Sequence, residues 1–483
     1  MNLDPTDWQA MRDLGHRMVD DMMGYLETVR DRPAWKPVPE STKSLLDQDP
    51  PLGPTPAEEV YADFVDHVLP YPLGNIHPRF WGWVIGTGTP LGALAEMLAA
   101  TMNPNVGGGD HAANYVERQV IEWFKTLFGL PPGASGVLTS GASMANILAI
   151  AVARNARAGF DIRHQGLGAA PRKLVFYASV EAHSCVKKAA ELLGIGSDNL
   201  RLIPVNDRFE IEIGDLKAAV THDRSEGLEP FAVIGNAGTV NTGALDDLAG
   251  LADLCEAENL WFHVDGAIGA VAAISPAQKP LLRGMERADS IAFDFHKWLY
   301  VPYEAGCLLV RREPDHSGAF ATRASYLASH DRGAAGGEIW YSDYGVELSR
   351  GFRALKIWMS LREHGLEKYA RMIEQNVAQC RHLERLVNDA PDLELLAPVA
   401  LNIVCFRYRA PGLDDEALNG LNREILMRLH ESGIAVPTYA TLGGRYVLRV
   451  AHTNHRSEDR DFDLLVAETR RIGAELAASR GVS

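Results

Sequence analysis

The sequence predicts an α/β fold built on a mostly parallel β-sheet. From about residue 135 onward, short apolar runs alternate with helical segments such as 143–158, 182–193 and 248–258. Strands that alternate with helices are typical of a parallel sheet with helices on both faces. The strand-like runs are residues 136–139, 174–177, 201–204, 231–234, 260–264, 290–293 and 306–310.

The segments on either side of this pattern differ from it. Apolar residues recur at steps of three and four from Trp8 to Val29, which predicts an amphipathic helix. Residues 32–58 are rich in proline and polar residues and predict an extended connector. The apolar stripe needs burial, and its simplest partner is a second copy of the chain, so we expect a homodimer.

The C-terminal part is predicted to be a smaller α+β domain. It is mainly helical after residues 352–361, with strand-like pieces at 402–408 and 445–451. We therefore expect three units: an N-terminal helical dimerisation segment (1–88), a large domain (89–357) and a small C-terminal domain (358–483).

Composition argues against several classes of partner. Acidic residues number 63 and basic residues 47, which gives a formal net charge of −16. A chain this acidic repels phosphate backbones and anionic lipid surfaces, so we expect no nucleic-acid or membrane partner. The five cysteines show no CxxC spacing, so they indicate neither a zinc site nor a disulfide framework. The start has no secretory apolar region and no run could span a membrane, which favours a cytoplasmic location.

Ligands of open α/β sheets bind at the carboxyl ends of the strands, so we looked for chemistry there. Lys297 closely follows the run 290–293 and is flanked by Phe295 and Trp298. Partial desolvation lowers the pKa of an amine and makes it a competent Schiff-base nucleophile. On position alone, a surface lysine lying over aromatic side chains is an equally good interpretation.

Three further strand ends carry candidate groups. Asp265 could pair with a pyridinium nitrogen, although a carboxylate there is more often a turn or cap residue. The small residues of 139–146 could bring backbone N–H groups to a phosphate, or form an ordinary serine N-cap. His183 could stack on an aromatic cofactor ring, or be a capping or core histidine.

Taken together and in this order, these features are specific. Residues 60–460 resemble the group II pyridoxal-5′-phosphate (PLP)-dependent amino-acid decarboxylases, close to the aromatic-L-amino-acid decarboxylase branch. The histidine-lysine-tryptophan element is the most specific carrier. The matching segments are HPRFWGW (77–83), TSGASMAN (139–146), EAHS (181–184), NAGTVNTGALDD (236–247), HVDGA (263–267), DFHKW (294–298) and FRALKIW (352–358).

The resemblance implies the PLP aminotransferase-like fold (fold type I), with a mostly parallel seven-stranded sheet in a PLP-binding large domain. It also implies a homodimer with its active sites at the interface. Lys297 would hold PLP as a Schiff base, Asp265 would pair with the pyridine nitrogen, and His183 would stack on the ring. The remaining implied contacts are Ala142, Ser143, Asp294 and His296 around the phosphate, and Thr239 and Ala267 near the ring.

The implied activity is decarboxylation of an L-amino acid, expected to be aromatic, to the amine and CO₂. In this family a mobile loop supplies a tyrosine as the Cα proton donor. The loop corresponds to Arg323–Tyr344, and spacing to FRALKIW favours Tyr341 over Tyr344. Decarboxylation coupled to oxidative deamination, which gives an aldehyde, and decarboxylation of a non-aromatic amino acid stay open, as does an aminotransferase.

One departure bears on the substrate. Aromatic decarboxylases carry bulky apolar residues in the segment that matches 103–110, which here reads NPNVGGGD. Trp81 and Trp83 could still supply an aromatic wall to the side-chain pocket. The sequence therefore leaves the shape and polarity of that pocket open.

Rival classes lack their signatures. The glycines of 86–92 do not have the GxGxxG spacing of a nicotinamide site, and 141–145 lacks the last glycine of GxSxG. His452 and His455 lack the additional ligands of a zinc site. A catalytically silent binding protein would have no need of Lys297, Asp265 and His183 together.

Overall fold

The computed structural model describes residues 2–322 and 332–479, and its centre is a seven-stranded sheet in the order β1-β7-β6-β5-β4-β2-β3. Strands β2 to β6 run parallel to one another, and β7 lies between β1 and β6 and is antiparallel to both. The predicted fold class is confirmed. The strands are β1 (Ser135–Thr139), β2 (Leu174–Ser179), β3 (Leu200–Ile203), β4 (Glu229–Asn236), β5 (Trp261–Asp265), β6 (Ser290–Asp294) and β7 (Gly306–Val310).

The register of this sheet brings three strand ends to one edge. Asn236 at the end of β4 lies opposite Asp265 at the end of β5, and Asp265 lies opposite Ala292 of β6. Because β4, β5 and β6 are parallel, the residues that follow each strand emerge on the same side. Asp294 and Lys297 follow Ala292 and therefore lie near Asp265.

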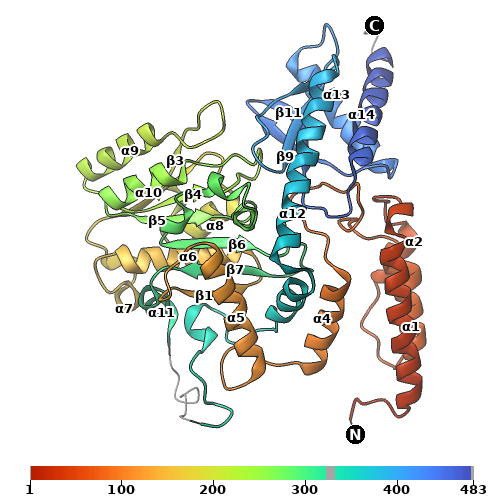
Figure 1. Cartoon of the computed structure of the whole chain (residues 1–483), viewed down its shortest axis with the longest axis horizontal. Coiled ribbons are helices and arrows are strands. Elements are labelled where there is room, and N and C mark those ends of the chain that lie inside the picture. The colour runs from red at the N-terminus through yellow and green to blue at the C-terminus, as the bar shows by residue number, and fades with distance from the viewer. Residues whose placement is uncertain (1, 323–331, 480–483) are drawn as a thin grey trace.

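Helices cover the sheet and bury its almost wholly apolar strands (Figure 1). Helix α6 crosses β1 and β4 to β7, with α8 and α11 packed beside it. Its N-terminal end therefore sits over the edge where β5 and β6 end. The helices of this part are α4 (Pro90–Met102), α5 (Ala112–Leu127), α6 (Ala142–Arg157), α7 (Ile162–Gln165), α8 (Ser184–Leu192), α9 (Ile213–Ser225), α10 (Leu248–Ala257) and α11 (Glu313–Phe320).

A long helix connects this sheet to a second, antiparallel sheet in the order β10-β11-β9-β8 (Figure 1). This helix, α12, is interrupted at Gly365, whose φ of 68° is left-handed and suits glycine. The elements of this part are α12 (Ala354–Asp389), β8 (Leu393–Leu395), β9 (Ile403–Tyr408), α13 (Asp415–Glu431), β10 (Thr438–Leu442), β11 (Arg445–Ala451) and α14 (Asp459–Ser479).

The N-terminal helix lies at the edge of the molecule, as Figure 1 shows in red. Helix α1 (Trp8–Glu27) covers most of the predicted stretch, and α2 (Glu40–Leu46) and α3 (Ala57–Asp63) follow it. The side chain of Leu14 is buried, but Trp8 is 56% exposed and Met11 is 41% exposed. The apolar stripe of α1 is thus only partly covered by its own chain. None of the described helices is both long and apolar enough to cross a membrane.

Candidate active site

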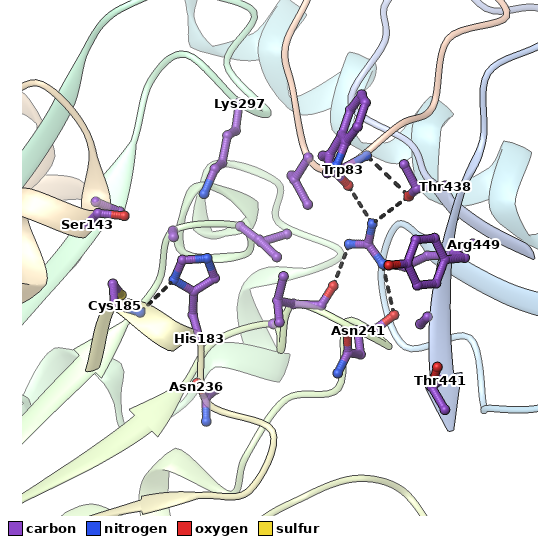
Figure 2. Close-up of a pocket in the computed structure, with 18 of the residues that line it drawn as sticks. Trp83, Ser143, His183, Cys185, Asn236, Asn241, Lys297, Thr438, Thr441 and Arg449 are labelled. Atoms are coloured by element: carbon purple, nitrogen blue, oxygen red, sulfur yellow. Dashed lines mark hydrogen bonds between the residues drawn. The ribbon is translucent and has the colours of Figure 1, made fainter. Parts of the chain in front are cut away.

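A cavity of about 1020 Å³ opens at the sheet edge where β4, β5 and β6 end. Its inner wall comes from this edge and from the start of α6, and its outer wall comes from α13, β10 and β11 (Figure 2). The cavity is therefore built between the large sheet and the smaller one. Of the predicted site residues it is lined by Ala142, Ser143, His183, Asp265, Ala267 and Lys297.

Lys297 lies in the turn after β6, and its ammonium nitrogen is 2.9 Å from Oδ2 of Asp294. The segment around Gly86 packs directly on this turn, and its N–H donates to the carbonyl of His296 at 3.0 Å. A Cβ at Gly86 would lie 2.4 Å from the carbonyl oxygens of both His296 and Lys297. Glycine at position 86 therefore lets the chain hold the lysine turn closely.

Asp265 ends β5 and is 4% exposed. Its Oδ1 accepts a hydrogen bond from the Ala267 N–H at 3.1 Å, which orients the carboxylate beside the cavity. Burial, reinforced by the negative charge of Asp265, raises the pKa of the neighbouring Cys185 thiol to about 12. Cys185 is therefore a neutral wall of the cavity and no thiolate nucleophile.

His183 caps α8, and its Nδ1 accepts a hydrogen bond from the Cys185 N–H at 3.2 Å. Desolvation in the cavity lowers the pKa of His183, and the charge of Asp265 opposes this shift. The imidazole is therefore neutral near pH 7, with its proton on Nε2. Figure 2 shows the Lys297 side chain extending toward this ring from the other side of the cavity.

The start of α6 offers backbone donors to an anion. Its N-cap, Gly141, supplies no capping side chain, and the Ala142 N–H donates to Oδ1 of Asp294 at 2.7 Å. The N–H groups of Ser143 and Met144 have no acceptor among the described residues. Free first-turn N–H groups at the wall of a cavity suit a phosphate, so the residues present fit PLP.

His296 stands behind this helix end. Its Nδ1 accepts the Ala305 N–H at 3.1 Å, and its ring packs on Tyr303 with centroids 4.1 Å apart. Burial lowers the pKa of His296, so the ring is neutral. Its Nε2 lies 3.7 Å from Oδ1 of Asp294, near the N-terminal end of α6.

Four predicted residues do not line the cavity: Asp294 and His296, which lie behind the start of α6, and Thr239 and Tyr341. Thr239 is buried in the turn after β4, where its hydroxyl accepts the Ala244 N–H at 3.1 Å. Tyr341 is 2% exposed and lies under the Arg350 guanidinium, 5.1 Å from the ring centroid. It lines a separate small cavity beside β1. Tyr344 donates its hydroxyl hydrogen to Glu313 at 3.0 Å, and residues 323–331 of the predicted loop lie outside the described residues.

Of the two tryptophans that could form an aromatic wall, only Trp83 lines the cavity. Trp83 lines the cavity and is 51% exposed, whereas Trp81 is fully buried against Phe462, with ring centroids 4.7 Å apart. The segment 103–110 also lies away from the cavity of its own chain. A Cβ at Gly108 would lie 2.2 Å from the Trp340 ring, so this segment packs on the base of the predicted loop.

Sequence reasoning missed a buried network behind the cavity. The side-chain Oδ1 of Asn146 accepts from Nε2 of His263 at 2.7 Å, and Nδ1 of His263 pairs with the Ser290 hydroxyl at 2.8 Å. Burial lowers the pKa of His263 to about 4, so this ring is a neutral donor. Asn146 and His263 lie inside the segments 139–146 and 263–267, which carry the family resemblance. The resemblance therefore marked both positions, although their role in the network was not predicted.

Arg449 was also missed. It is 3% exposed, and its guanidinium donates to the carbonyls of Trp83 at 2.6 Å and Asn241 at 3.1 Å, and to that of Val240. Burial lowers the pKa of Arg449 to about 10, so it stays charged near pH 7. It places a positive charge in the outer wall and holds β11 against the turn after β4 (Figure 2).

Comparisons with known proteins agree with this geometry. Residues 39–409 match the pyridoxal-dependent decarboxylase conserved domain, and the chain belongs to this family. An aromatic-L-amino-acid decarboxylase of Bacillus atrophaeus is 31% identical, over 98% of this chain and 97% of the relative. A phenylacetaldehyde synthase of Arabidopsis thaliana is also 31% identical, over 93% of each chain.

Solved structures are similar over the whole fold. The crystal structure of Oryza sativa TDC with PLP and tryptamine has a TM-score of 0.90 at 27% identity, over 98% of this chain and 100% of that one. Mouse CSAD has a TM-score of 0.90 at 26% identity, over 98% and 99%. The chain is thus a PLP-dependent carboxy-lyase that acts on amino acids. When bound, PLP supplies an electron sink for the electron pair left behind as CO₂ departs.

Proposed function

We propose that this chain converts an aromatic L-amino acid into the corresponding amine and CO₂. The observation that carries the proposal is one cavity that joins Lys297, Asp265 and His183 to aromatic side chains in its outer wall, Trp83 and Tyr439. Aromatic walls bind aromatic side chains through apolar burial and ring packing. The similarity to an aromatic-L-amino-acid decarboxylase supports the same substrate class.

Each inner residue has a distinct proposed role. Lys297 would hold the cofactor covalently through its side-chain amine. Asp265 would pair with the ring nitrogen of the cofactor and keep that nitrogen protonated. The neutral His183 ring packs on the cofactor ring, and the free amides of Ser143 and Met144 bind its phosphate. These groups would hold the cofactor ring in place, so that the substrate carboxylate can be oriented to leave as CO₂.

The reaction products test the proposal. We expect L-tryptophan, L-tyrosine or L-phenylalanine to give amine and CO₂ in equal amounts. We expect kcat/KM to exceed that for L-glutamate by about 100-fold or more, because Trp83 and Tyr439 would bury an aromatic side chain and the Arg449 guanidinium is already bound by backbone carbonyls. All common L-amino acids should be tried, with CO₂, amine, aldehyde and H₂O₂ measured together. Equimolar aldehyde and H₂O₂ would instead favour the aldehyde-forming reaction of the synthase relatives.

The proton donor to Cα can be sought in the same assay. The hydroxyls of Tyr341 and Tyr344 lie outside the cavity, so changing either to phenylalanine should leave the ratio of amine to aldehyde unchanged. Tyr326 is the third tyrosine of the predicted loop and lies outside the described residues. The Tyr326→Phe variant should therefore be measured together with Tyr341→Phe and Tyr344→Phe. A raised aldehyde fraction in one variant identifies the donor, and no change in any of the three points to His183.

We also propose that the functional unit is a homodimer. Beyond Trp8 and Met11 of α1, three apolar side chains of α4 are exposed, Met97, Leu98 and Met102. Figure 1 places α1 and α4 on the same side of the molecule. Exposed apolar side chains on such helices are typical of an interface between subunits.

Removal of α1 tests the dimer. Deleting residues 1–27 keeps Arg30, which is ion-paired with Asp461, and Ala34, which is buried. We expect aggregation or a monomer whose activity is reduced about tenfold or more, because the apolar surface that α1 would cover on the partner is then exposed to water. Analytical ultracentrifugation measures the oligomeric state, and activity assays measure the loss of turnover.

The double variant Trp8→Ser, Met11→Ser should also weaken the dimer and reduce activity. The double variant Gln9→Ser, Arg12→Ser is the matched control. A monodisperse, fully active truncation argues against the proposal.

A further inference from the structure

Asp294 links the cofactor lysine to the helix that faces the phosphate site. It is 2% exposed at the end of β6. One carboxylate oxygen accepts the Ala142 N–H at 2.7 Å, and the other lies 2.9 Å from the Lys297 ammonium. The carboxylate thus occupies the first backbone donor of α6 and is also the counter-ion of the lysine.

Two glycines make this contact possible. A Cβ at Gly306 of β7 would lie 2.5 Å from Cα of Gly141 and 2.8 Å from Oδ1 of Asp294. A Cβ at Gly141 would lie 3.2 Å from the His296 ring. Without side chains at these positions, the end of β6 and the start of α6 approach closely enough for the carboxylate to bond the helix amide.

The groups around Asp294 only partly compensate its charge. The Lys297 ammonium is the one full positive charge that contacts it among the described residues. His296 is neutral because burial lowers its pKa, and Tyr303 stacks on that imidazole as a neutral phenol because burial raises its pKa. Covalent attachment of PLP at Lys297 would remove the free ammonium that contacts Asp294.

We propose that Asp294 is an internal anion that holds Lys297 and α6 together in the cofactor-free protein and weakens the binding of the cofactor's phosphate. This inference rests on the proposed attachment of PLP to Lys297. A helix N-terminus stabilises negative charge, but a carboxylate and a phosphate at the same helix end repel each other. The amides of Ser143 and Met144 remain for the phosphate, so PLP binds beside Asp294 against this repulsion.

The Asp294→Asn variant tests the inference, because asparagine has the same shape and keeps an oxygen to accept from Ala142. Equilibrium dissociation constants are measured for PLP and for pyridoxal, which lacks the phosphate. The variant should bind PLP about tenfold or more tightly than the wild type, with little change for pyridoxal, because one unit of repulsion is removed. The cofactor-free variant should also melt at a lower temperature than the cofactor-free wild type.

Asp289→Asn is the matched control, because it removes a carboxylate beside the opposite end of the same strand. It should leave the ratio of the two dissociation constants unchanged. A purely structural role for Asp294 would lower the melting temperature and weaken both ligands alike, which would overturn the inference. PLP binding that is equal to or weaker than wild type would also overturn it. A wild type that binds no PLP would instead contradict the proposed function.

Discussion

Replacing Lys297 by alanine should abolish both turnover and the covalent attachment of PLP. The side chain is the one lysine amine that lines the cavity among the described residues. Without it the cofactor cannot be attached covalently, and the cavity loses an amine that can move protons. We expect kcat to fall by about 10³-fold or more. Borohydride reduction of the wild type with PLP, followed by peptide mapping, should place the label on Lys297.

Lys356 provides the control for this experiment. It is buried in α12, where its ammonium pairs with Glu96 at 2.6 Å, and it lies outside the cavity. Burial lowers the pKa of Lys356, so it too could react with an aldehyde that reached it. The Lys356→Ala variant should keep the label on residue 297. A label on Lys356 or any other lysine in the wild type would refute the assignment.

The fold was predictable because the strands of a buried sheet are continuous apolar runs. Each predicted run of the large sheet overlaps an observed strand, and the differences lie at the strand ends. The run 231–234 predicted only the centre of β4, which extends from Glu229 to Asn236. Apolar content cannot identify such ends, because their place in the strand depends on hydrogen bonds to neighbouring strands. The antiparallel direction of β7 likewise depends on pairing that no local pattern encodes.

The inner half of the site was predictable for the same reason. Asp265 ends a strand, Lys297 and His183 each follow one, and parallel strands bring their ends to one edge. The outer wall was not predictable, because Arg449 reaches the cavity only when the small sheet docks on the large one. Trp81 and Trp83 would share one side of an extended strand, but Trp83 has a φ of 49°, which turns the chain between them.

The spacing that favours Tyr341 as the proton donor does not describe how its side chain packs, and its role stays a prediction. Its distance along the chain from FRALKIW matched the expected loop tyrosine, yet the side chain is buried beside β1 under Arg350. Arg350 also pairs with the buried Glu117 at 2.6 Å, so this region is part of the core of the large domain. A sequence gives the order of residues in a loop, but whether a tyrosine faces a cavity depends on where the loop packs.

Asp265→Asn should fold and bind PLP, yet lose nearly all turnover. Asparagine has the shape of aspartate and keeps an oxygen that can accept the Ala267 N–H, so the end of β5 should be preserved. The substitution removes the negative charge at position 265. A carboxylate beside the ring nitrogen keeps that nitrogen protonated, and a neutral amide does not.

We expect kcat to fall by about 10³-fold or more. The Asp265 carboxylate stabilises the transition state electrostatically, and its charge is strong because the site is shielded from water. KM and the melting temperature should change little, which separates this effect from unfolding. Equilibrium titration with PLP and steady-state kinetics measure these quantities. Asp265→Ala is a poorer test, because it also opens a cavity beside Cys185. Near-wild-type turnover in Asp265→Asn would show that another group protonates the ring nitrogen. In the described part of the cavity lining, no other carboxylate is present to do so.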